Sequence, residues 1–213
     1  MSGSRSSPAA LQAQWRDHVA DAGLTDPRER IGRAVIGAYG GLGRRYHDRG
    51  HIAYLLGEID RNANLISDIA RLRFAAWFHD AVYVTWRKDN EARSARWAAS
   101  ALRSMGASDG FADRVNALIR ATADHAGGGA DADDDLFLDM DFSILGAPPE
   151  RYDRYVRQVR LEYWWAPPWL FRPARKGFIE RALARERIFL TDTYENRLGD
   201  QARENLRREL ERL

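Results

Sequence analysis

A histidine and an aspartate stand together where an apolar stretch of this sequence ends. Residues 69–78 are apolar on nearly every side of a helix, and His79 and Asp80 follow them. Burying an imidazole beside a carboxylate costs several kcal/mol unless something compensates. A metal ion compensates both groups, because a neutral imidazole nitrogen and a carboxylate oxygen are ordinary metal ligands. The structural alternative is that Asp80 caps a neighbouring helix while His79 donates to a backbone carbonyl.

Of the four other histidines, His47, His51 and His125 stand where they could take part in a site, whereas His18 does not. His47 and His51 are four residues apart, and both face one side of a helix if that helix extends back to His47. Such a pair can bind one ion, although the glutamate of metalloprotease helices is absent. His125 follows an expected helix and precedes three glycines, where a helix end can present it to a cleft. His18 has no partner pattern, and we expect a structural role for it.

Two aspartates interrupt a second apolar run, residues 137–146. Asp139 and Asp141 are two residues apart, so on a helix they cannot share a face. We expect one of them to point inward and the other to cap a helix or face solvent. A separate acidic run, residues 131–135, adjoins glycines, and we expect a solvated loop there.

Apolar residues recur at helical spacing through most of the chain, and no stretch alternates with the period of a strand. The expected helices cover residues 11–19, 27–38, 51–59, 69–79, 90–105, 109–124, 137–145, 149–164, 176–191 and 194–213. The segment Trp164–Pro173 has too many prolines for a helix interior. We therefore predict an all-α fold with a disordered start, residues 1–10, and one helical domain, residues 11–213.

The composition narrows the class of protein. Hydrophobic residues make up 45% of the 213 residues and charged residues 30%, as in soluble globular proteins. No apolar run approaches the ~18 residues that cross a bilayer, and the N-terminus has no apolar signal region. We expect a cytoplasmic protein without a membrane partner. The absence of cysteine excludes disulfides, thiolate nucleophiles and cysteine-type zinc sites.

The charge balance gives no reason to expect a nucleic-acid partner. The chain has 33 basic and 31 acidic residues, and a net charge of +2 does not gather nucleic acid. Residues 151–176 mix arginine with tyrosine and tryptophan, a composition that can stack bases. At helical spacing, however, this mixture is more typical of a buried face beside a solvated one.

The ordered set His51, His79-Asp80 and Asp141 resembles the H…HD…D signature of the HD-domain superfamily, which comprises all-α metal-dependent phosphohydrolases. The likeness is closest to the small predicted HD phosphohydrolases of bacteria, and it covers about residue 30 to the end. The segments that carry it are RYHDRGHI (45–52), FHDAVY (78–83), DNEARSA (89–95), ATADH (121–125), LDMDFSILG (138–146), Tyr152, Tyr155, RLEY (160–163) and ARENL (202–206).

The resemblance implies an HD-domain-like helical bundle with a metal site between its central helices. By likeness, the ligands are His51, His79, Asp80 and Asp141, with Asp139 as the fallback for the last position. Two imidazoles and two carboxylates suit one divalent ion, which the ligand set does not identify among Mn, Co, Ni, Zn, Fe and Mg.

The resemblance also implies the reaction, the hydrolysis of a phosphomonoester or phosphodiester of a small metabolite, foremost a nucleotide. Asp80 would also orient the attacking water, and His47 or His125 would protonate the leaving oxygen. Arg45 and Arg160 are candidate phosphate clamps, since guanidinium groups match phosphate geometry. Glu91 is a candidate to bind water or a group next to the ligands. For Arg45, Arg160 and Glu91, a structural ion pair is the alternative.

Two other functions remain open at this stage. Some HD-fold proteins are di-iron oxygenases, which need further ligands that His47 and His125 would have to supply. A metal-stabilised binding or regulatory module without turnover would have the same sequence pattern. The sequence also leaves open whether the protein forms a homo-oligomer.

Overall fold

The protein is all-helical, as the apolar spacing predicts. The computed structural model describes residues 6–123 and 129–213, and these ranges contain no strand. Their α-helices are α1 (Pro8–Asp21), α2 (Arg30–Ala38), α3 (Arg49–Arg61), α4 (Ile69–Phe78), α5 (Asn90–Ser104), α6 (Asp109–Ala121), α7 (Ala132–Phe142), α8 (Pro149–Glu162), α9 (Pro168–Leu183) and α10 (Asp192–Leu210). Short 3-10 helices are η1 (Pro27–Glu29), η2 (Ala63–Leu65) and η3 (Ser143–Gly146). Within the described ranges no helix has the length and hydropathy to cross a membrane.

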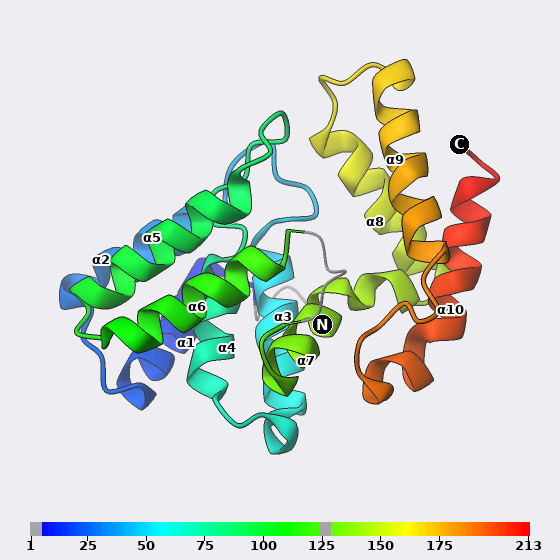
Figure 1. The fold of residues 1–213 in the computed structure, drawn as a ribbon. Coiled ribbons are helices and arrows are strands. Elements are labelled where there is room, and N and C mark those ends of the chain that lie inside the picture. Colours follow the sequence, from blue (N-terminus) through cyan, green and yellow to red (C-terminus); the bar gives the residue numbers. More distant parts are fainter. Residues whose placement is uncertain (1–5, 124–128) are drawn as a thin grey trace.

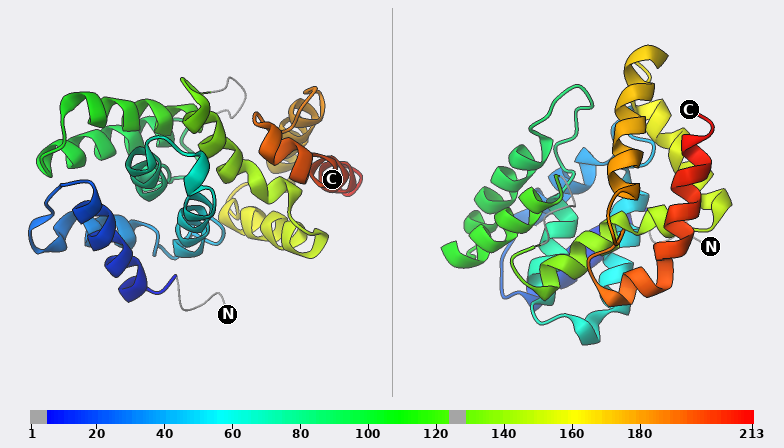
Figure 2. Two further views of the ribbon diagram at one scale, coloured as in Figure 1. Left: turned by 90° about the horizontal axis from the view of Figure 1, so that it is seen from below. Right: turned by 45° about the vertical axis from the view of Figure 1, so that its right-hand side comes forward.

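The helices form three groups (Figures 1 and 2). α1, α2, α5 and α6 lie on one side, α8, α9 and α10 lie on the other, and α3, α4 and α7 lie between them. α5 packs along α6, α4 contacts both of them and α3, and α10 packs on η3 and α9. The central group is therefore the one that both outer groups cover.

α4 is buried nearly all round because it lies in the centre of this arrangement. Trp15 of α1 makes edge-to-face contacts with Phe74, Trp77 and Phe78, at centroid distances of 5.8, 5.4 and 6.0 Å. The indole of Trp77 donates to Nδ1 of His18 at 3.1 Å. Burial lowers the pKa of His18 to about 4, so this histidine is a neutral core residue, as expected.

The start of the first helix and the course of the proline-rich segment differ from the sequence-based expectation. α1 begins at Pro8, where Ser7 caps it, so residues 8–10 are not disordered; residues 1–5 lie outside the described ranges. Residues 168–173 of the segment expected to be non-helical form the first part of α9, which ends at Leu183 and not at residue 191. Pro168 occupies the first helical position, where no N–H is needed, and Pro173 removes one hydrogen bond that the buried face of α9 offsets.

The acidic run 131–135 is not a solvated loop. Asp131 caps α7, and Asp133 and Asp134 are buried at the start of that helix. The guanidinium of Arg71 lies among them and makes a two-pronged contact with Asp131 at 2.8 and 2.9 Å. A buried cation from α4, distant in the sequence, compensates these carboxylates and fixes the first turn of α7.

We expect Gly146→Ala to lower the free energy of unfolding by about 1–3 kcal/mol. A Cβ at this position would lie 2.7 Å from the carbonyl oxygen of Leu198, which is backbone and cannot move aside. The control is Gly37→Ala in α2, where a Cβ meets nothing within 4 Å and a gain of roughly 0.5–1 kcal/mol is expected. Urea unfolding measures both. Equal stability of the wild type and Gly146→Ala would contradict the close packing of α10 on η3.

Candidate metal centre

Three helix ends bring the candidate ligands together. His51 lies in the first turn of α3, whose N-terminus Asp48 caps by accepting from the amides of Gly50 and His51. His79 is the residue that ends α4, and Asp80 follows it. Asp141 lies in the last turn of α7. The site is therefore built where the three central helices meet.

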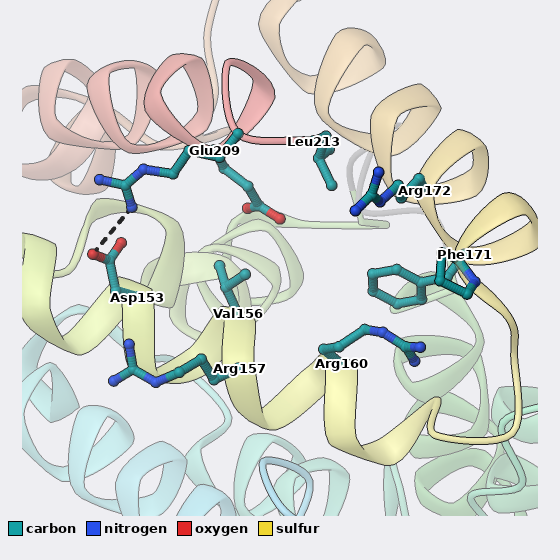
Figure 3. Close-up of a pocket in the computed structure, with 10 residues that line it drawn as sticks. Asp153, Val156, Arg157, Arg160, Phe171, Arg172, Glu209 and Leu213 are labelled. Atoms are coloured by element: carbon teal, nitrogen blue, oxygen red, sulfur yellow. Dashed lines mark hydrogen bonds and ion pairs between the residues drawn. The ribbon is translucent and has the colours of Figure 1, made fainter.

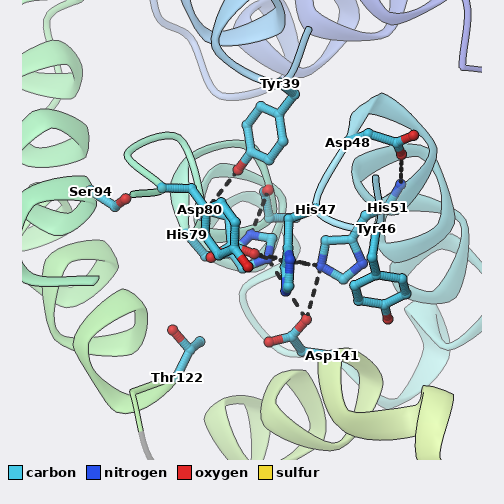
Figure 4. A network of polar contacts seen from close by, with 12 residues as sticks. Tyr39, Tyr46, His47, Asp48, His51, His79, Asp80, Ser94, Thr122 and Asp141 are labelled. Atoms are coloured by element: carbon cyan, nitrogen blue, oxygen red, sulfur yellow. Dashed lines mark hydrogen bonds and ion pairs between the residues drawn. The ribbon is translucent and has the colours of Figure 1, made fainter. Parts of the chain in front are cut away.

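The side chains converge on one point (Figure 4). His51 Nε2 and His79 Nε2 are 3.0 Å apart, and Asp141 Oδ1 is 3.1 Å from His51 Nε2. These ligand atoms of His51, His79 and Asp141 all lie within 4.8 Å of one another. Asp80 Oδ2 lies 3.1 Å from His79 Nε2 and 3.9 Å from His51 Nε2. The structure thus brings together His51, His79 and Asp141, with Asp80 beside both imidazoles; these are the four residues that the resemblance implied as ligands.

The hydrogen bonding of His79 suits a metal ligand. Its Nδ1 lies 3.0 Å from the carbonyl oxygen of Ala76, which can only accept, so Nδ1 carries the proton. In the neutral ring, Nε2 then holds a lone pair that points at Nε2 of His51. His51, His79 and Asp141 would hold one ion, because their ligand atoms all lie within 4.8 Å of one another. The donor set therefore fits a single transition-metal ion.

The electrostatics of the cluster favour a positive charge at its centre. Burial lowers the pKa of His79, but the carboxylates of Asp80 and Asp141 outweigh it and raise that pKa to about 9. Burial raises the pKa of Asp80, yet the imidazoles of His79 and His47 bring it far below its ordinary value. The carboxylate of Asp80 therefore stays ionised at neutral pH. The amide of Asp80 donates to the hydroxyl of Tyr39 at 3.0 Å, which fixes the backbone at this position.

His47 lies beside the cluster but does not belong to α3. The helix begins at Arg49, so the expected shared helix face of His47 and His51 is not formed. Instead, His47 Nδ1 is 2.7 Å from Glu162 Oε2, and its ring stacks on Tyr83. Burial lowers the pKa of His47, and the charges of Asp80 and Glu162 raise it above its ordinary value. This histidine is therefore held by Nδ1 and poised to carry a proton.

Glu162 is the residue that the sequence did not single out. It is buried at the end of α8, and its Oε1 accepts from the amides of Arg45, Tyr46 and His47 at 2.8, 2.8 and 3.0 Å. Its Oε2 accepts from His47 and from the hydroxyl of Tyr83. Its place in the segment RLEY was the only signal available in the sequence. Glu162 positions His47 and the chain that enters α3.

Three further candidate residues, Arg160, Glu91 and His125, are not seen to join the imidazole cluster. Arg160 donates to the carbonyls of Tyr163 and Ala166 and stacks over Phe171, in a separate pocket of about 370 Å³ between α8, α9 and α10 (Figure 3). Its guanidinium thus binds the carbonyl groups that follow α8 and does not face the imidazoles. Glu91 lies in the first turn of α5 and near Tyr163. His125 lies outside the described residues.

A second pocket adjoins His51. It has a volume of about 320 Å³, and Arg45, Arg151 and Arg154 line it together with Tyr54. Arg151 stacks over the Tyr54 ring at 4.4 Å. Arg45, one of the expected phosphate clamps, therefore stands beside the cluster, accompanied by two arginines of α8 that the sequence analysis did not select.

Asp139 has a role of its own. Its carboxylate is buried and accepts from the amides of Leu190 and Thr191 at 2.7 Å each and from the Thr191 hydroxyl. It anchors the start of α10 and does not join the imidazoles, whereas Asp141 does. The two aspartates point to different neighbours, as their spacing on a helix requires. The expectation that one of them caps a helix or faces solvent was wrong for Asp139, which is buried against the backbone just before α10.

The comparisons with known proteins add no family to this description. No protein-family model, no curated protein and no solved structure matches the chain. The case for its function therefore rests on the residues and their geometry.

We expect Asp141→Asn to lower the affinity for Mn²⁺ or Co²⁺ on the order of 100-fold, because an amide cannot supply the anionic oxygen. Asp139→Asn should leave that affinity unchanged and lower the free energy of unfolding by about 1–3 kcal/mol, since its amide group would face backbone donors. Titration calorimetry and urea unfolding separate the two effects. The reverse order of affinities would show that Asp139 is the ligand.

Glu162 should make the fold sensitive to acid. Burial raises its pKa, but the hydrogen bonds from His47 and the backbone amides outweigh it and lower that pKa to about 2, against 4.5 in the unfolded chain. The stabilisation is complete above pH 4.5 and is lost as the pH falls towards 2. It amounts to about 3 kcal/mol.

Glu162→Gln should therefore be less stable at pH 7 and lose less stability than the wild type between pH 5 and 2. The measurement is urea unfolding across this pH range. The exposed Glu186→Gln is the matched control. If Glu162→Gln lost as much stability as the wild type between pH 5 and 2, the carboxylate of Glu162 would not be the cause of the acid sensitivity.

Proposed function

We propose that this protein is a metal-dependent phosphohydrolase of the HD type that acts on a small phosphorylated metabolite, foremost a nucleotide. The observation that carries the proposal is the 3.0 Å approach of two imidazole nitrogens with the carboxylates of Asp80 and Asp141 beside them. The arginine-lined pocket against His51 supports an anionic substrate.

His51, His79 and Asp141 would hold the ion, with Asp80 as the fourth candidate. Imidazole nitrogens favour Mn, Fe, Co, Ni or Zn over Mg, which prefers oxygen ligands. When bound, such an ion supplies Lewis acidity at the phosphoryl group and acidifies water.

The other residues supply positioning and proton transfer. Asp80, ionised at neutral pH, can accept a hydrogen bond from the attacking water and orient it. His47 carries its Nδ1 proton towards Glu162, which leaves Nε2 to donate to the leaving oxygen. Its raised pKa favours the protonated form, which a general acid requires. Arg45 and Arg151 would hold non-bridging or neighbouring phosphate oxygens.

The double variant His79→Ala/Asp80→Ala tests this proposal. The purified wild type should contain about one equivalent of a transition metal and release phosphate from members of a panel of nucleotides and aryl phosphates. The double variant should lose both, because it lacks a nitrogen and an oxygen ligand, while its helix content stays nearly intact. Elemental analysis, a phosphate assay and circular dichroism are the measurements.

The exposed Asp113→Ala on α6 is the control and should keep metal and activity. Metal without phosphate release from any substrate would favour the binding or regulatory module. About two equivalents of iron would favour the oxygenase. No metal in the wild type, even after incubation with these ions, would overturn the proposed centre.

A further inference from the structure

Five large apolar side chains stand exposed on three segments that are far apart in the sequence. They form what we call the tryptophan patch: Leu42, Trp86, Trp164, Trp169 and Leu170, with exposed fractions of 95, 70, 76, 74 and 45%. Leu42 lies between α2 and α3, Trp86 between α4 and α5, and the other three between α8 and the first turn of α9. Apolar surface on this scale costs solubility and marks an interaction site.

The three segments meet at one end of the molecule. Gly41 and Gly43, on either side of Leu42, line a hollow of about 480 Å³ together with Trp86 and Trp164. Trp86 and Leu170 share a neighbouring hollow of about 390 Å³. The α4–α5 and α8–α9 connections and the first turn of α9 reach the same upper end in Figure 1. The patch is therefore a set of loop tips around two hollows.

Exposed basic side chains lie on two of the patch's segments. Lys88 and Arg172 are exposed on two of its segments, and Arg87 pairs with Asp89. The other acidic residues of these segments have roles elsewhere, since Asp48 caps α3 and Asp80 belongs to the metal centre. An occupant of this surface should therefore be apolar in part and negatively charged at its rim.

We propose that the tryptophan patch docks onto the surface of an anionic lipid bilayer. Tryptophan favours the bilayer interface, leucine the hydrocarbon below it, and lysine and arginine the anionic headgroups. Two copies of this chain meeting through the patch would bring their basic rims together. Single-stranded nucleic acid would stack on the tryptophans but gains little from Leu42 and Leu170. The sequence analysis expected no membrane partner because no apolar run is long enough to span a bilayer. Peripheral docking needs no such helix.

Cosedimentation of the full chain with vesicles tests the proposal without reference to enzymatic activity. The protein should bind phosphatidylcholine vesicles that contain phosphatidylglycerol and bind pure phosphatidylcholine weakly, and its tryptophan emission should shift to the blue. Trp164→Ala/Trp169→Ala should bind at least tenfold more weakly. Lys88→Ala/Arg172→Ala should lose about fivefold for each charge removed.

The matched control is Leu65→Ala, an exposed apolar residue on η2, outside the three segments. It should bind vesicles as the wild type does. All of these side chains are exposed, and circular dichroism verifies that each variant is folded. Wild-type vesicle binding by Trp164→Ala/Trp169→Ala, or no binding to anionic vesicles, overturns the proposal. Two other results would also overturn it. One is a dimer in sedimentation velocity that Trp164→Ala/Trp169→Ala abolishes while vesicle binding stays unchanged. The other is salt-sensitive binding of an oligothymidylate that this variant abolishes while vesicle binding stays unchanged.

Discussion

The approach of two buried imidazoles to two carboxylates is the constraint on which the centre of this structure depends. His51 and His79 bring their Nε2 atoms to 3.0 Å, so the ends of α3 and α4 have to meet at a fixed distance. Asp141 adds the end of α7 to the same point. An apolar α4 makes this possible, because packing on all sides holds its C-terminal end in place.

Glu162 extends this constraint to the C-terminal part of the chain. Hydrogen-bond donors stabilise a buried carboxylate, and here three backbone amides, an imidazole and a phenol supply them. The segment before α3 therefore takes its shape from the last residue of α8. The groups that face the proposed reaction depend on helices from both halves of the sequence.

Apolar residues at helical spacing predicted the helices, and polar residues within apolar runs drew attention to His79, Asp80, Asp139 and Asp141. His51 was assigned as a ligand only by the resemblance to HD-domain proteins. The resemblance favoured Asp141, but the spacing alone did not choose between Asp139 and Asp141, since the choice depends on which face of α7 meets α4. The sequence analysis missed Glu162, whose partners lie more than a hundred residues away. It also mistook residues 131–135 for a loop, because Arg71, whose charge compensates these carboxylates, is distant in the sequence.

The buried acids of this protein are compensated in different ways, and the difference identifies the centre. Asp139 and Glu162 accept from backbone amides, and Glu209 pairs with an arginine. Asp80 and Asp141 instead face imidazoles, which are neutral when they act as ligands. Two carboxylates and two neutral imidazoles leave a charge of about −2 in a buried space. A divalent cation would balance that charge, and a protonated His47 beside Asp80 also contributes to the balance.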